Sequence, residues 1–370
     1  MKVGIDAREI KNSNTGVGTY VLNLIKALGD IDHENEYFLF VDSDFNQIPK
    51  LSKNFKFCTI KSYLNKKVQD QYEIVRNISK YKLDVFHVTH HDVVPLFTNI
   101  PLVITVHDIA WLDIPSNSSI FQIYYYCITR LAMRKARVLL AVSKSTKVRI
   151  KEHFRSAFFK TTAIQIACDP YYYQISTDKN DIDNLCKEFN LSIPYILYVG
   201  SFAKRKNLSL LFKAMNIVCK NITNVQLVIA GKASGNTDTD INIRKGNDLN
   251  LISISRNKTL AELKYLYQNA AMLVFPSVNE GFGLPVLEAM ACGCPVIASN
   301  TTSLPEILGD SGILINPYDE CVLADQIVKV LQNPHIADQM RKDGKLRAIE
   351  FNWKKVALET IDNYRLAINN

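Results

Sequence analysis

Residues 276–298 read Pro-Ser-Val-Asn-Glu-Gly-Phe-Gly-Leu-Pro-Val-Leu-Glu-Ala-Met-Ala-Cys-Gly-Cys-Pro-Val-Ile-Ala, the most informative stretch of the chain. In it, Glu280 and Glu288 flank a glycine turn that opens into a predicted helix with a proline in its first turn, where amides lack helical partners. The amides around Gly283 and Leu284 then lie at the positive end of the helix dipole, which suits phosphate oxygens. Because a carboxylate on each side can accept hydrogen bonds from sugar hydroxyls, the stretch predicts a site for a nucleotide-sugar.

The simpler interpretation of this stretch is a buried strand, a loop and a core helix. As a whole, however, it resembles the retaining glycosyltransferases of family 4, which have the two-domain GT-B architecture. The resemblance rests on the Glu-x7-Glu spacing, the Gly-Phe-Gly-Leu-Pro turn and the following Glu-Ala-Met-Ala-x-Gly-x-Pro-Val-Ile-Ala. It implies that Phe282, Gly283 and Leu284 contact the donor. It also implies that Glu280 binds the donor sugar and that Glu288 holds the ribose hydroxyls.

Length and composition indicate a globular protein of two domains. The chain has 370 residues, and single hydrophobic cores stop growing near ~250–300 residues. It is 47% hydrophobic and 22% charged, which does not indicate disorder. Its apolar runs fall short of the ~20 residues that span a bilayer, and its N-terminus is charged too soon for a signal peptide. Eight cysteines without a Cys-x-x-Cys pair indicate reduced thiols, so we expect a cytoplasmic protein.

The charge balance favours anionic partners. Lys and Arg number 44 against 36 Asp and Glu, a formal charge of +8. The basic residues do not form one block, which argues against a nucleic-acid partner. A denser group between Arg130 and Lys151 follows three tyrosines, Tyr124 to Tyr126. A solvated helix face is the simpler interpretation of this group. A peripheral contact with the inner face of an anionic membrane is the alternative, because basic residues meet lipid headgroups and aromatic rings settle at the interface.

Short apolar runs alternate with helical patterns along the whole chain. Their continuous hydrophobicity predicts parallel strands covered on both faces, and the alternation predicts two doubly wound, Rossmann-like α/β domains. We place the domains at 1–185 and 186–352, with the boundary near the polar stretch 175–184. The resemblance implies that the first binds the acceptor, the second binds the nucleotide-sugar, and the two face each other across a cleft. It also implies that the helix at 353–370 crosses back onto the first domain.

A glycine loop follows the first predicted strand, which ends at Asp6. Gly16 and Gly18 in this loop let backbone amides approach a ligand closely. The loop lacks the third glycine of the dinucleotide fingerprint, which disfavours a dehydrogenase, and a tight turn alone would explain it. The family resemblance places this loop against the donor phosphates and the acceptor.

A His-Asp pair, His107 and Asp108, follows the predicted strand Leu102–Val106. A histidine that hydrogen bonds within the core is the simpler interpretation of a strand-end His. The resemblance implies instead that His107 presents its imidazole to the transferred sugar, and that Asp108 orients His107 or its loop.

A basic loop opens the second domain, with the sequence Gly-Ser-Phe-Ala-Lys-Arg-Lys-Asn at residues 200–207. At the carboxyl end of a strand, Arg205 and Lys206 could clamp a phosphate, Arg through a bidentate contact and Lys as a mobile point charge. The resemblance adds Gly200 and Ser201 to the donor site. Many family members carry Arg directly after the glycine where this chain has Ser201, so Arg205 and Lys206 must supply the charge here.

Four further signals lie elsewhere in the chain. Arg256 falls where family members often touch the nucleotide base, although a strand-end turn is as good an interpretation. Thr301–Glu306 matches a family loop near the donor site. Asp-x-Asp pairs at 42–44 and 238–240 could bind a divalent ion but are better explained as turns. The histidine-rich stretch 87–92 makes a poor zinc site, so we expect no essential metal or other cofactor.

These signals together predict a transferase that moves a sugar from a nucleotide diphosphate, and the resemblance implies that it is a retaining hexosyltransferase. Arg205, Lys206 and the amides near Gly283 would stabilise the leaving diphosphate in place of a metal. The resemblance implies a GDP- or UDP-linked donor, with mannose mildly preferred, and a glycan or lipid-linked acceptor in surface polysaccharide or lipopolysaccharide synthesis. A nucleotide-sugar epimerase of the same fold and a non-catalytic nucleotide-sugar-binding protein are the alternatives.

Overall fold

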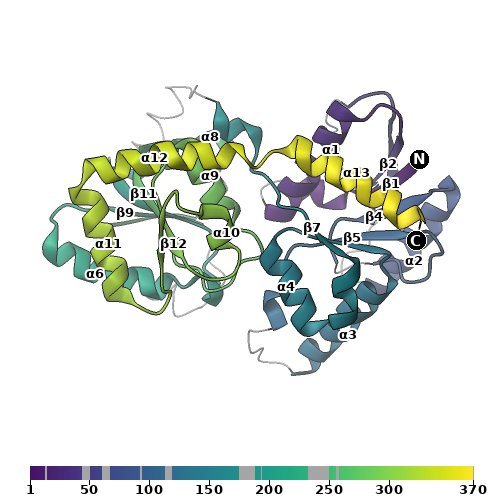
Figure 1. The fold of residues 1–370 in the computed structure, drawn as a ribbon, viewed down its shortest axis with the longest axis horizontal. Helices are drawn as coiled ribbons and strands as arrows, with labels where there is room; N and C mark the ends of the chain where they lie inside the picture. Colours follow the sequence, from purple (N-terminus) through teal and green to yellow (C-terminus); the bar gives the residue numbers. More distant parts are fainter. Residues whose placement is uncertain are drawn as a thin grey trace. The chain divides into compact units, whose positions relative to one another are not determined.

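The computed structural model describes residues 1–12, 15–43, 51–60, 67–91, 94–112, 119–174, 188–192, 194–231, 250–255 and 258–369. The chain forms two compact units (Figure 1). Unit 1 comprises residues 1–167 and 352–370, and unit 2 comprises residues 168–351. No helix among these described ranges is long and apolar enough to cross a membrane.

The passage from unit 1 to unit 2 lies earlier than the predicted boundary at residue 185. A short 3-10 helix, η5 (Pro170–Tyr173), already belongs to unit 2. Its Tyr173 hydroxyl donates a hydrogen bond to the carbonyl of Ala348 at 2.9 Å, and its Tyr172 ring meets Tyr267 edge-on at 5.9 Å. These contacts tie η5 to the core of unit 2. The polar stretch 175–184 used for the prediction lies outside the described residues.

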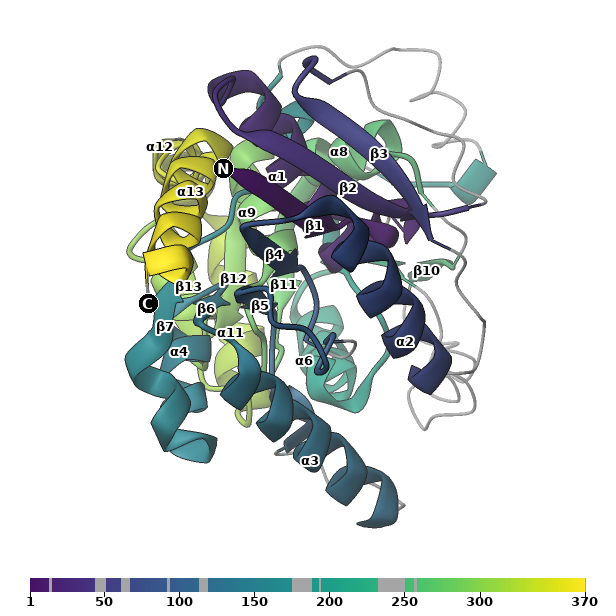
Figure 2. The ribbon, with the colours of Figure 1, turned by 90° about the vertical axis from the view of Figure 1, so that its right-hand side faces the viewer.

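Unit 1 contains a seven-stranded parallel sheet in the order β3-β2-β1-β4-β5-β6-β7 (Figure 2). Its strands are β1 (Lys2–Asp6), β2 (Glu36–Asp42), β3 (Phe55–Ile60), β4 (Val85–Val88), β5 (Leu102–Val106), β6 (Val138–Ala141) and β7 (Thr161–Ala163). The helices of this unit are η1 (Arg8–Asn12), α1 (Gly16–Ile31), α2 (Lys67–Ile78), η2 (Ser79–Tyr81), η3 (Ala110–Leu112), α3 (Ser119–Lys135), α4 (Lys144–His153), η4 (Arg155–Lys160) and α13 (Trp353–Asn369).

Helices cover both faces of the sheet in unit 1 (Figure 1). Phe86 of β4 belongs to the core that includes Ile74 of α2 and Met133 of α3. The next residue, His87, points to the opposite face because side chains alternate along a strand, and its Nδ1 lies 2.7 Å from the hydroxyl of Tyr364 in α13. Helix α13 packs beside α1 on this second face and so returns the chain to unit 1.

Unit 2 contains a six-stranded parallel sheet in the order β10-β9-β8-β11-β12-β13. Its strands are β8 (Tyr195–Val199), β9 (Leu227–Ala230), β10 (Leu251–Ile254), β11 (Ala270–Phe275), β12 (Val296–Ser299) and β13 (Ile313–Ile315). Besides η5, its helices are η6 (Lys204–Lys206), α6 (Leu208–Asn221), α8 (Leu260–Asn269), α9 (Leu284–Cys292), α10 (Leu304–Leu308), α11 (Glu320–Gln332) and α12 (Pro334–Ile349). Helices α6 and α11 lie side by side, as do α9 and α12.

Both sheets share one winding order. Numbered within its own unit, the sheet of unit 2 runs 3-2-1-4-5-6, and the sheet of unit 1 runs the same way with a seventh strand at its edge. This is the doubly wound order of nucleotide-binding domains, in which ligands bind beyond the carboxyl ends of the strands where the order reverses. The prediction of two doubly wound α/β domains is therefore confirmed, and the reversal in unit 2 lies between β8 and β11.

Candidate functional site

The predicted donor residues of unit 2 gather where its strand order reverses. The loop after β8 carries Gly200, Ser201 and η6, and the loop after β11 carries residues 276–283. Because β8 and β11 are parallel neighbours, both loops leave the sheet at the same edge. This is the position at which a doubly wound domain binds its ligand.

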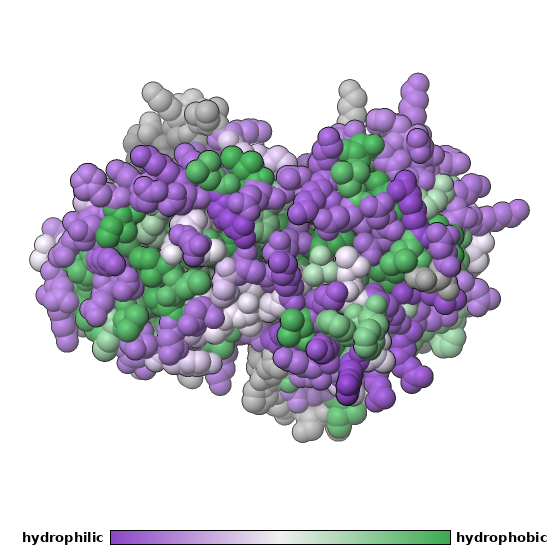
Figure 3. Space-filling view, in the orientation of Figure 1, coloured by the Kyte–Doolittle hydropathy of each residue, from purple (hydrophilic) through white to green (hydrophobic). Residues whose placement is uncertain are grey.

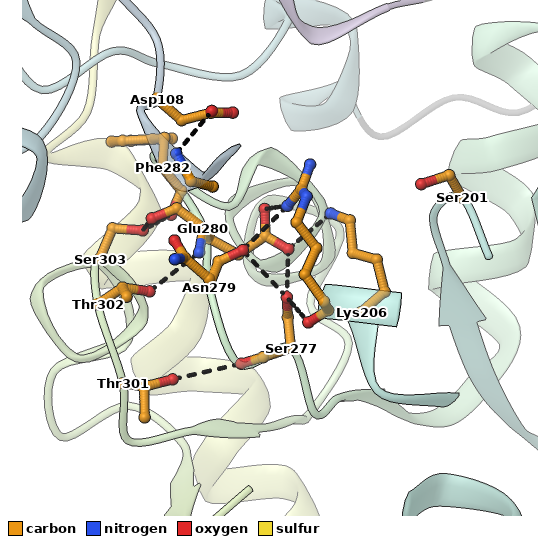
Figure 4. A network of polar contacts seen from close by, with 12 residues as sticks. Asp108, Ser201, Lys206, Ser277, Asn279, Glu280, Phe282, Thr301, Thr302 and Ser303 are labelled. Carbon is orange, nitrogen blue, oxygen red and sulfur yellow. Dashed lines mark hydrogen bonds and ion pairs between the residues drawn. The ribbon is translucent and has the colours of Figure 1, made fainter. Parts of the chain in front are cut away.

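Gly200 is required by the backbone at this edge. It takes a φ of +152°, and its amide donates to the carbonyl of Ala230 at 3.1 Å. A side chain on the neighbouring Gly231 would place its Cβ 1.7 Å from the carbonyl oxygen of Gly200. The ends of β8 and β9 therefore approach too closely for any other residue at 231. Ser201 is exposed, and Figure 4 shows it apart from the hydrogen-bonded cluster described next.

A buried ion cluster forms between the two loops. The Lys206 ammonium lies 2.6 Å from Glu280 Oε1, and Arg205 Nη1 lies 3.1 Å from Glu280 Oε2. The side chains of Glu280, Lys206 and Arg205 are 8%, 10% and 25% exposed. Figure 4 shows the Glu280 carboxylate directed at Lys206 and at Ser277, whose hydroxyl donates to Oε1 at 2.6 Å. The two cations predicted to bind phosphate and the carboxylate predicted to bind sugar thus form one cluster with a net charge of +1.

Backbone contacts fix this cluster in place. The Val278 amide donates to the Arg205 carbonyl at 2.8 Å. Asn207 ends η6 in the left-handed region at a φ of 55°, a conformation that asparagine tolerates better than most residues. Its side-chain amide donates to the carbonyls of Pro276 at 3.3 Å and Pro317 at 2.7 Å. Sequence reasoning did not identify Asn207 or Ser277, although each stands within a predicted motif.

The loop between β12 and α10 supports Glu280 from the other side. The Glu280 amide donates to Thr302 Oγ1 at 3.1 Å, and Ser303 Oγ donates to the Glu280 carbonyl at 3.1 Å (Figure 4). Thr302 has a φ of 52°, which is unusual for a β-branched residue and is held here by its surroundings. Strain of this kind concentrates at functional sites. The predicted family loop at residues 301–306 therefore contributes hydroxyl groups that orient Glu280.

Opposing effects set the pKa of Glu280. Burial alone would raise the pKa, but the Lys206 ammonium and then the Arg205 guanidinium outweigh it, so the pKa lies below its usual value. Lys206 also sits 5.0 Å above the ring of Phe275, a favourable cation–π position. Glu280 is therefore a fixed carboxylate at neutral pH, able to accept hydrogen bonds but not to donate a proton.

The glycine turn before α9 has the geometry of an anion-binding helix terminus. Gly283 takes a φ of +114°, and an added Cβ would lie 2.7 Å from Leu304 Cδ2. It occupies the N-cap position without a side-chain cap, and Leu284 is the first helical residue. The free amides at this end form the positive pole of the helix dipole and can donate hydrogen bonds to an anion. The Phe282 ring is 5% exposed and packs edge-on against Phe351 at 6.1 Å, so this side chain belongs to the core of unit 2.

Glu288 differs from Glu280 in its electrostatics. It lies in the second turn of α9, where the Tyr267 hydroxyl donates to its Oε2 at 2.7 Å. Burial raises the pKa of Glu288 to about 7, the hydrogen bond from Tyr267 lowers it, and the nearby Asp169 raises it. Glu288 is consequently a mixture of acid and carboxylate near neutral pH, which lets it either donate to or accept from a hydroxyl group.

In unit 1, His107 directly follows β5. Its Nε2 lies 2.9 Å from the carbonyl of Thr89, so Nε2 carries the proton, and its ring meets Tyr20 edge-on at 4.9 Å. Burial, followed by the nearby His90, lowers the pKa of His107 to about 3. His107 is therefore neutral at physiological pH and cannot act as a general acid there. Asp108 accepts a hydrogen bond from the Ala110 amide at 3.1 Å, which shapes the loop after β5.

In the structure, the glycine loop of unit 1 has a local role at the start of α1, in keeping with the tight-turn alternative. The Gly18 amide donates to Thr15 Oγ1 at 3.1 Å and so completes the N-cap of α1. A Cβ at Gly18 would lie 2.2 Å from the Asn12 carbonyl oxygen. The close approach that requires Gly18 is thus to the chain itself. Gly16 is exposed as the first residue of α1.

The remaining predictions concern metals and the nucleotide base. Within the described ranges, no group of three or more His, Cys, Asp or Glu residues could hold a metal ion. Asp42 forms an ion pair with Lys11 at the end of β2. Arg256, Asp44, Asp92, Asp238 and Asp240 lie outside the described residues.

A doubly wound domain with two cations and an uncapped helix N-terminus at its strand-order reversal has an arrangement that suits the phosphate groups of a ligand. Residues 187–347 match the family described as glycosyl transferases group 1, and residues 14–169 match glycosyltransferase family 4. The chain belongs to these glycosyltransferases, and its fold is GT-B.

Known proteins similar to the chain include enzymes of polysaccharide synthesis. O-antigen chain mannosyltransferase B of Escherichia coli is 27% identical over 99% of this chain and 100% of its own length. Sucrose-phosphate synthase from Thermosynechococcus elongatus shares the fold with a TM-score of 0.77 and 22% identity, over 99% of this chain and 98% of that one. HepE of Anabaena, solved with UDP and glucose, shares it with a TM-score of 0.73 and 17% identity, over 98% of each chain.

Proposed function

We propose that this protein transfers mannose, or a similar hexose, from a nucleotide-diphosphate donor to a glycan or lipid-linked acceptor of a surface polysaccharide. The observation that carries the proposal is the Arg205–Lys206–Glu280 cluster beside the N-terminus of α9. Support for the sugar and the pathway comes from the likeness to the O-antigen mannosyltransferase, and support for a nucleotide-sugar donor comes from the fold shared with the UDP-bound HepE.

The cluster would act on the leaving diphosphate. An arginine fork can bind phosphate through two parallel hydrogen bonds, and a lysine adds a mobile positive charge. Ion pairing with Glu280 holds both cations in position before the donor arrives. Preorganised charge of this kind stabilises the charge that develops in the transition state without reorganisation at the moment of reaction. The amides of Gly283 and Leu284 at the helix terminus would contribute in the same way.

The carboxylates would hold the sugars. Glu280, ionised and fixed by Ser277, would accept hydrogen bonds from hydroxyls of the transferred hexose. Glu288, with a pKa of about 7, would bind the ribose hydroxyls. We propose a retaining reaction without an essential metal, in which the acceptor attacks from the leaving-group side and the departing phosphate takes the acceptor proton. In this scheme Glu280 orients the sugar through hydrogen bonds and forms no covalent bond to it.

A transfer assay tests the proposal. Purified protein would be incubated with GDP-mannose, UDP-glucose or UDP-galactose, with EDTA present and a short mannoside acceptor, and the product anomer would be read by NMR. We expect one donor to give a product with the donor's anomeric configuration. Donor interconversion without an acceptor would favour an epimerase instead. Nucleotide binding without any turnover, with several acceptors tried, would contradict the transferase assignment and favour a binding protein.

A further inference from the structure

We propose that Tyr267 is a positioning residue of the donor site. Its buried hydroxyl holds Oε2 of Glu288 and so directs Oε1 toward the ribose hydroxyls of the nucleotide. The inference rests on the proposed function, in which Glu288 binds the ribose, and it adds the group that orients Glu288. In this account Tyr267 touches no substrate and acts on donor binding through Glu288.

The contact between Tyr267 and Glu288 is short and enclosed. The Tyr267 hydroxyl donates to Glu288 Oε2 at 2.7 Å, and Tyr267 is fully buried while Glu288 is half-buried. Within the described part of the chain, no second side chain donates a hydrogen bond to this carboxyl group. Oε1 is therefore the oxygen best placed to accept a hydrogen bond from a ligand.

Both partners lie on helices that are held in place. Helix α8, which carries Tyr267, begins with a capping box between Thr259 and Glu262. The Tyr267 ring also packs edge-on against Tyr172 of η5. Helix α9, which carries Glu288, contacts both α8 and α12. Figure 3 shows mainly hydrophilic residues where Figure 1 draws α12, so α12 separates α9 from solvent on that side. Loss of the hydroxyl should thus release the carboxyl group without moving its helix.

Tyr267 is the donor in this contact. Burial, followed by the nearby charge of Glu288, raises the pKa of Tyr267 well above its usual value, so the hydroxyl keeps its proton. Oε2 must then accept, and a proton that Glu288 binds belongs on Oε1, the oxygen proposed to face the ribose. Ionised, Oε1 accepts hydrogen bonds from the ribose diol, and protonated, it becomes a donor. A hydrogen bond to a charged acceptor is the stronger of the two.

The Tyr267 hydroxyl also favours the ionised form of Glu288. Burial raises the pKa of Glu288 to about 7, the hydrogen bond from Tyr267 lowers it, and Asp169 raises it. Without the hydroxyl, the pKa of Glu288 should rise further. A larger fraction of Glu288 would then be neutral at pH 7.5, and its carboxyl group would be free to turn.

The other titratable groups around this carboxyl come from η5, α8, α9 and the residue before the N-cap of η5. They are Cys168, Asp169, Tyr172, Lys264 and Cys292. Burial raises the pKa of both cysteines and of Tyr172 well above their usual values, so these three stay neutral between pH 5 and 9. Asp169 and Lys264 are present in the wild type and in the variants below, so comparison of the proteins isolates Glu288.

Tyr267→Phe tests the inference, and Tyr195→Phe is its matched control. Tyr195 is also fully buried, and its hydroxyl donates to the carbonyl of Leu266, the residue before Tyr267, at 2.9 Å. Each substitution removes one buried hydroxyl that donates a hydrogen bond, but only the first removes a contact with Glu288. A general loss of packing should therefore appear in both variants.

Urea unfolding between pH 5 and 9 gives a readout that needs no nucleotide. Because the folded pKa of Glu288 lies above its unfolded value, stability should fall as pH rises toward the folded pKa and level off above it. In Tyr267→Phe the decline should end at higher pH than in the wild type, and in Tyr195→Phe at the same pH. In a Glu288→Gln background, Tyr267→Phe should cause no such shift. A decline that ends at the same pH in Tyr267→Phe and the wild type would overturn the inference.

Titration calorimetry at pH 7.5 with GDP, UDP and their 2′,3′-dideoxy forms tests the ribose contact. Tyr267→Phe should weaken binding of the ribonucleotide by about threefold to tenfold, the difference between a charged and a neutral hydrogen bond, and leave the dideoxy form unchanged. Tyr195→Phe should change neither. Equal losses for both forms, or no loss for either, would overturn the inference while the proposed function stands. A wild type that binds neither GDP nor UDP would overturn the proposed function and the ribose contact with it, whatever the urea result.

Discussion

Replacing Glu280 by Gln perturbs the ion cluster at its centre. The change removes the carboxylate that lies 2.6 Å from Lys206 and 3.1 Å from Arg205, and the hydroxyl of Ser277 loses its charged acceptor. Removing one partner of a buried ion pair costs about 3–5 kcal/mol, because the other charge stays buried without compensation. Lys206 is nearly buried but Arg205 is a quarter exposed, so we expect a loss of about 3 kcal/mol in the free energy of unfolding of unit 2.

The same change should separate donor binding from transfer. Two cations without a carboxylate hold a diphosphate at least as well as before, so the affinity for GDP or UDP should be unchanged or higher. The hexose would lose an ionised acceptor, and loss of one preorganised group costs about 10²–10³-fold in kcat. Urea unfolding, nucleotide titration by calorimetry and transfer kinetics would measure the three quantities.

A double variant supplies the control. Lys206→Gln/Glu280→Gln removes one charge of each sign, so part of the lost stability should return while transfer stays low. The two residues are in contact, so their effects on stability should not add. A Glu280→Gln variant that unfolds like the wild type, or one that transfers sugar at the normal rate, would refute the role assigned to the cluster.

Four further substitutions have defined outcomes. Ser277→Ala removes a hydrogen bond to the buried carboxylate of Glu280, which should cost about 1.5–3 kcal/mol in the free energy of unfolding. The change should also raise the pKa of Glu280 and so move the acid limb of the kcat/KM profile to higher pH. An acid limb at the same pH as in the wild type would contradict this. Glu288 has a folded pKa raised to about 7, so its ionisation should lower the stability of the protein as pH rises from about 4.5 to 7, by about 2–3 kcal/mol in total. Glu288→Gln should abolish that decline in urea titrations at pH 5 and 8, and an identical decline in the variant would rule the assignment out. Gly231→Ala should prevent folding of unit 2, because its Cβ would lie 1.7 Å from a carbonyl oxygen. Gly29→Ala in α1, where the nearest atom would be 3.5 Å from the added Cβ, should instead raise the free energy of unfolding by about 0.5–1 kcal/mol. Circular dichroism melts of the two variants would show whether the glycines differ in this way.

The sequence predicted the fold, and it proposed the candidate donor residues, from local patterns. Continuous apolar runs predicted the parallel strands, and the glycine turn at Gly283 predicted a helix terminus. The ion pairs of Glu280 with Arg205 and Lys206 join residues 75 and 74 positions apart in the chain. They form only because β8 and β11 are neighbours in the sheet. No local spacing carries that information, so the residues were predicted and their pairing was not.

Two predicted residues have structural explanations that the sequence could not provide. Gly18 avoids a clash with the carbonyl of Asn12, which depends on how η1 folds back on α1. The ring of Phe282 packs against Phe351 in the core of unit 2. A glycine or an aromatic residue inside a motif can either contact a ligand or pack within the protein, and its neighbours in three dimensions distinguish the two roles.

Thermal stabilisation by nucleotides in the presence of EDTA, measured for the wild type and for Lys206→Gln, tests the donor site most directly. A ligand that binds only the folded state at 100 times its Kd adds about 2.7 kcal/mol to stability. If the cluster after β8 and β11 binds the diphosphate, GDP or UDP compounds should raise the melting temperature of the wild type, NAD should not, and the shift should shrink in the variant measured against its own ligand-free baseline. An equal shift with NAD, no shift with any nucleotide, or a shift that is undiminished in Lys206→Gln would contradict the assignment of the donor site.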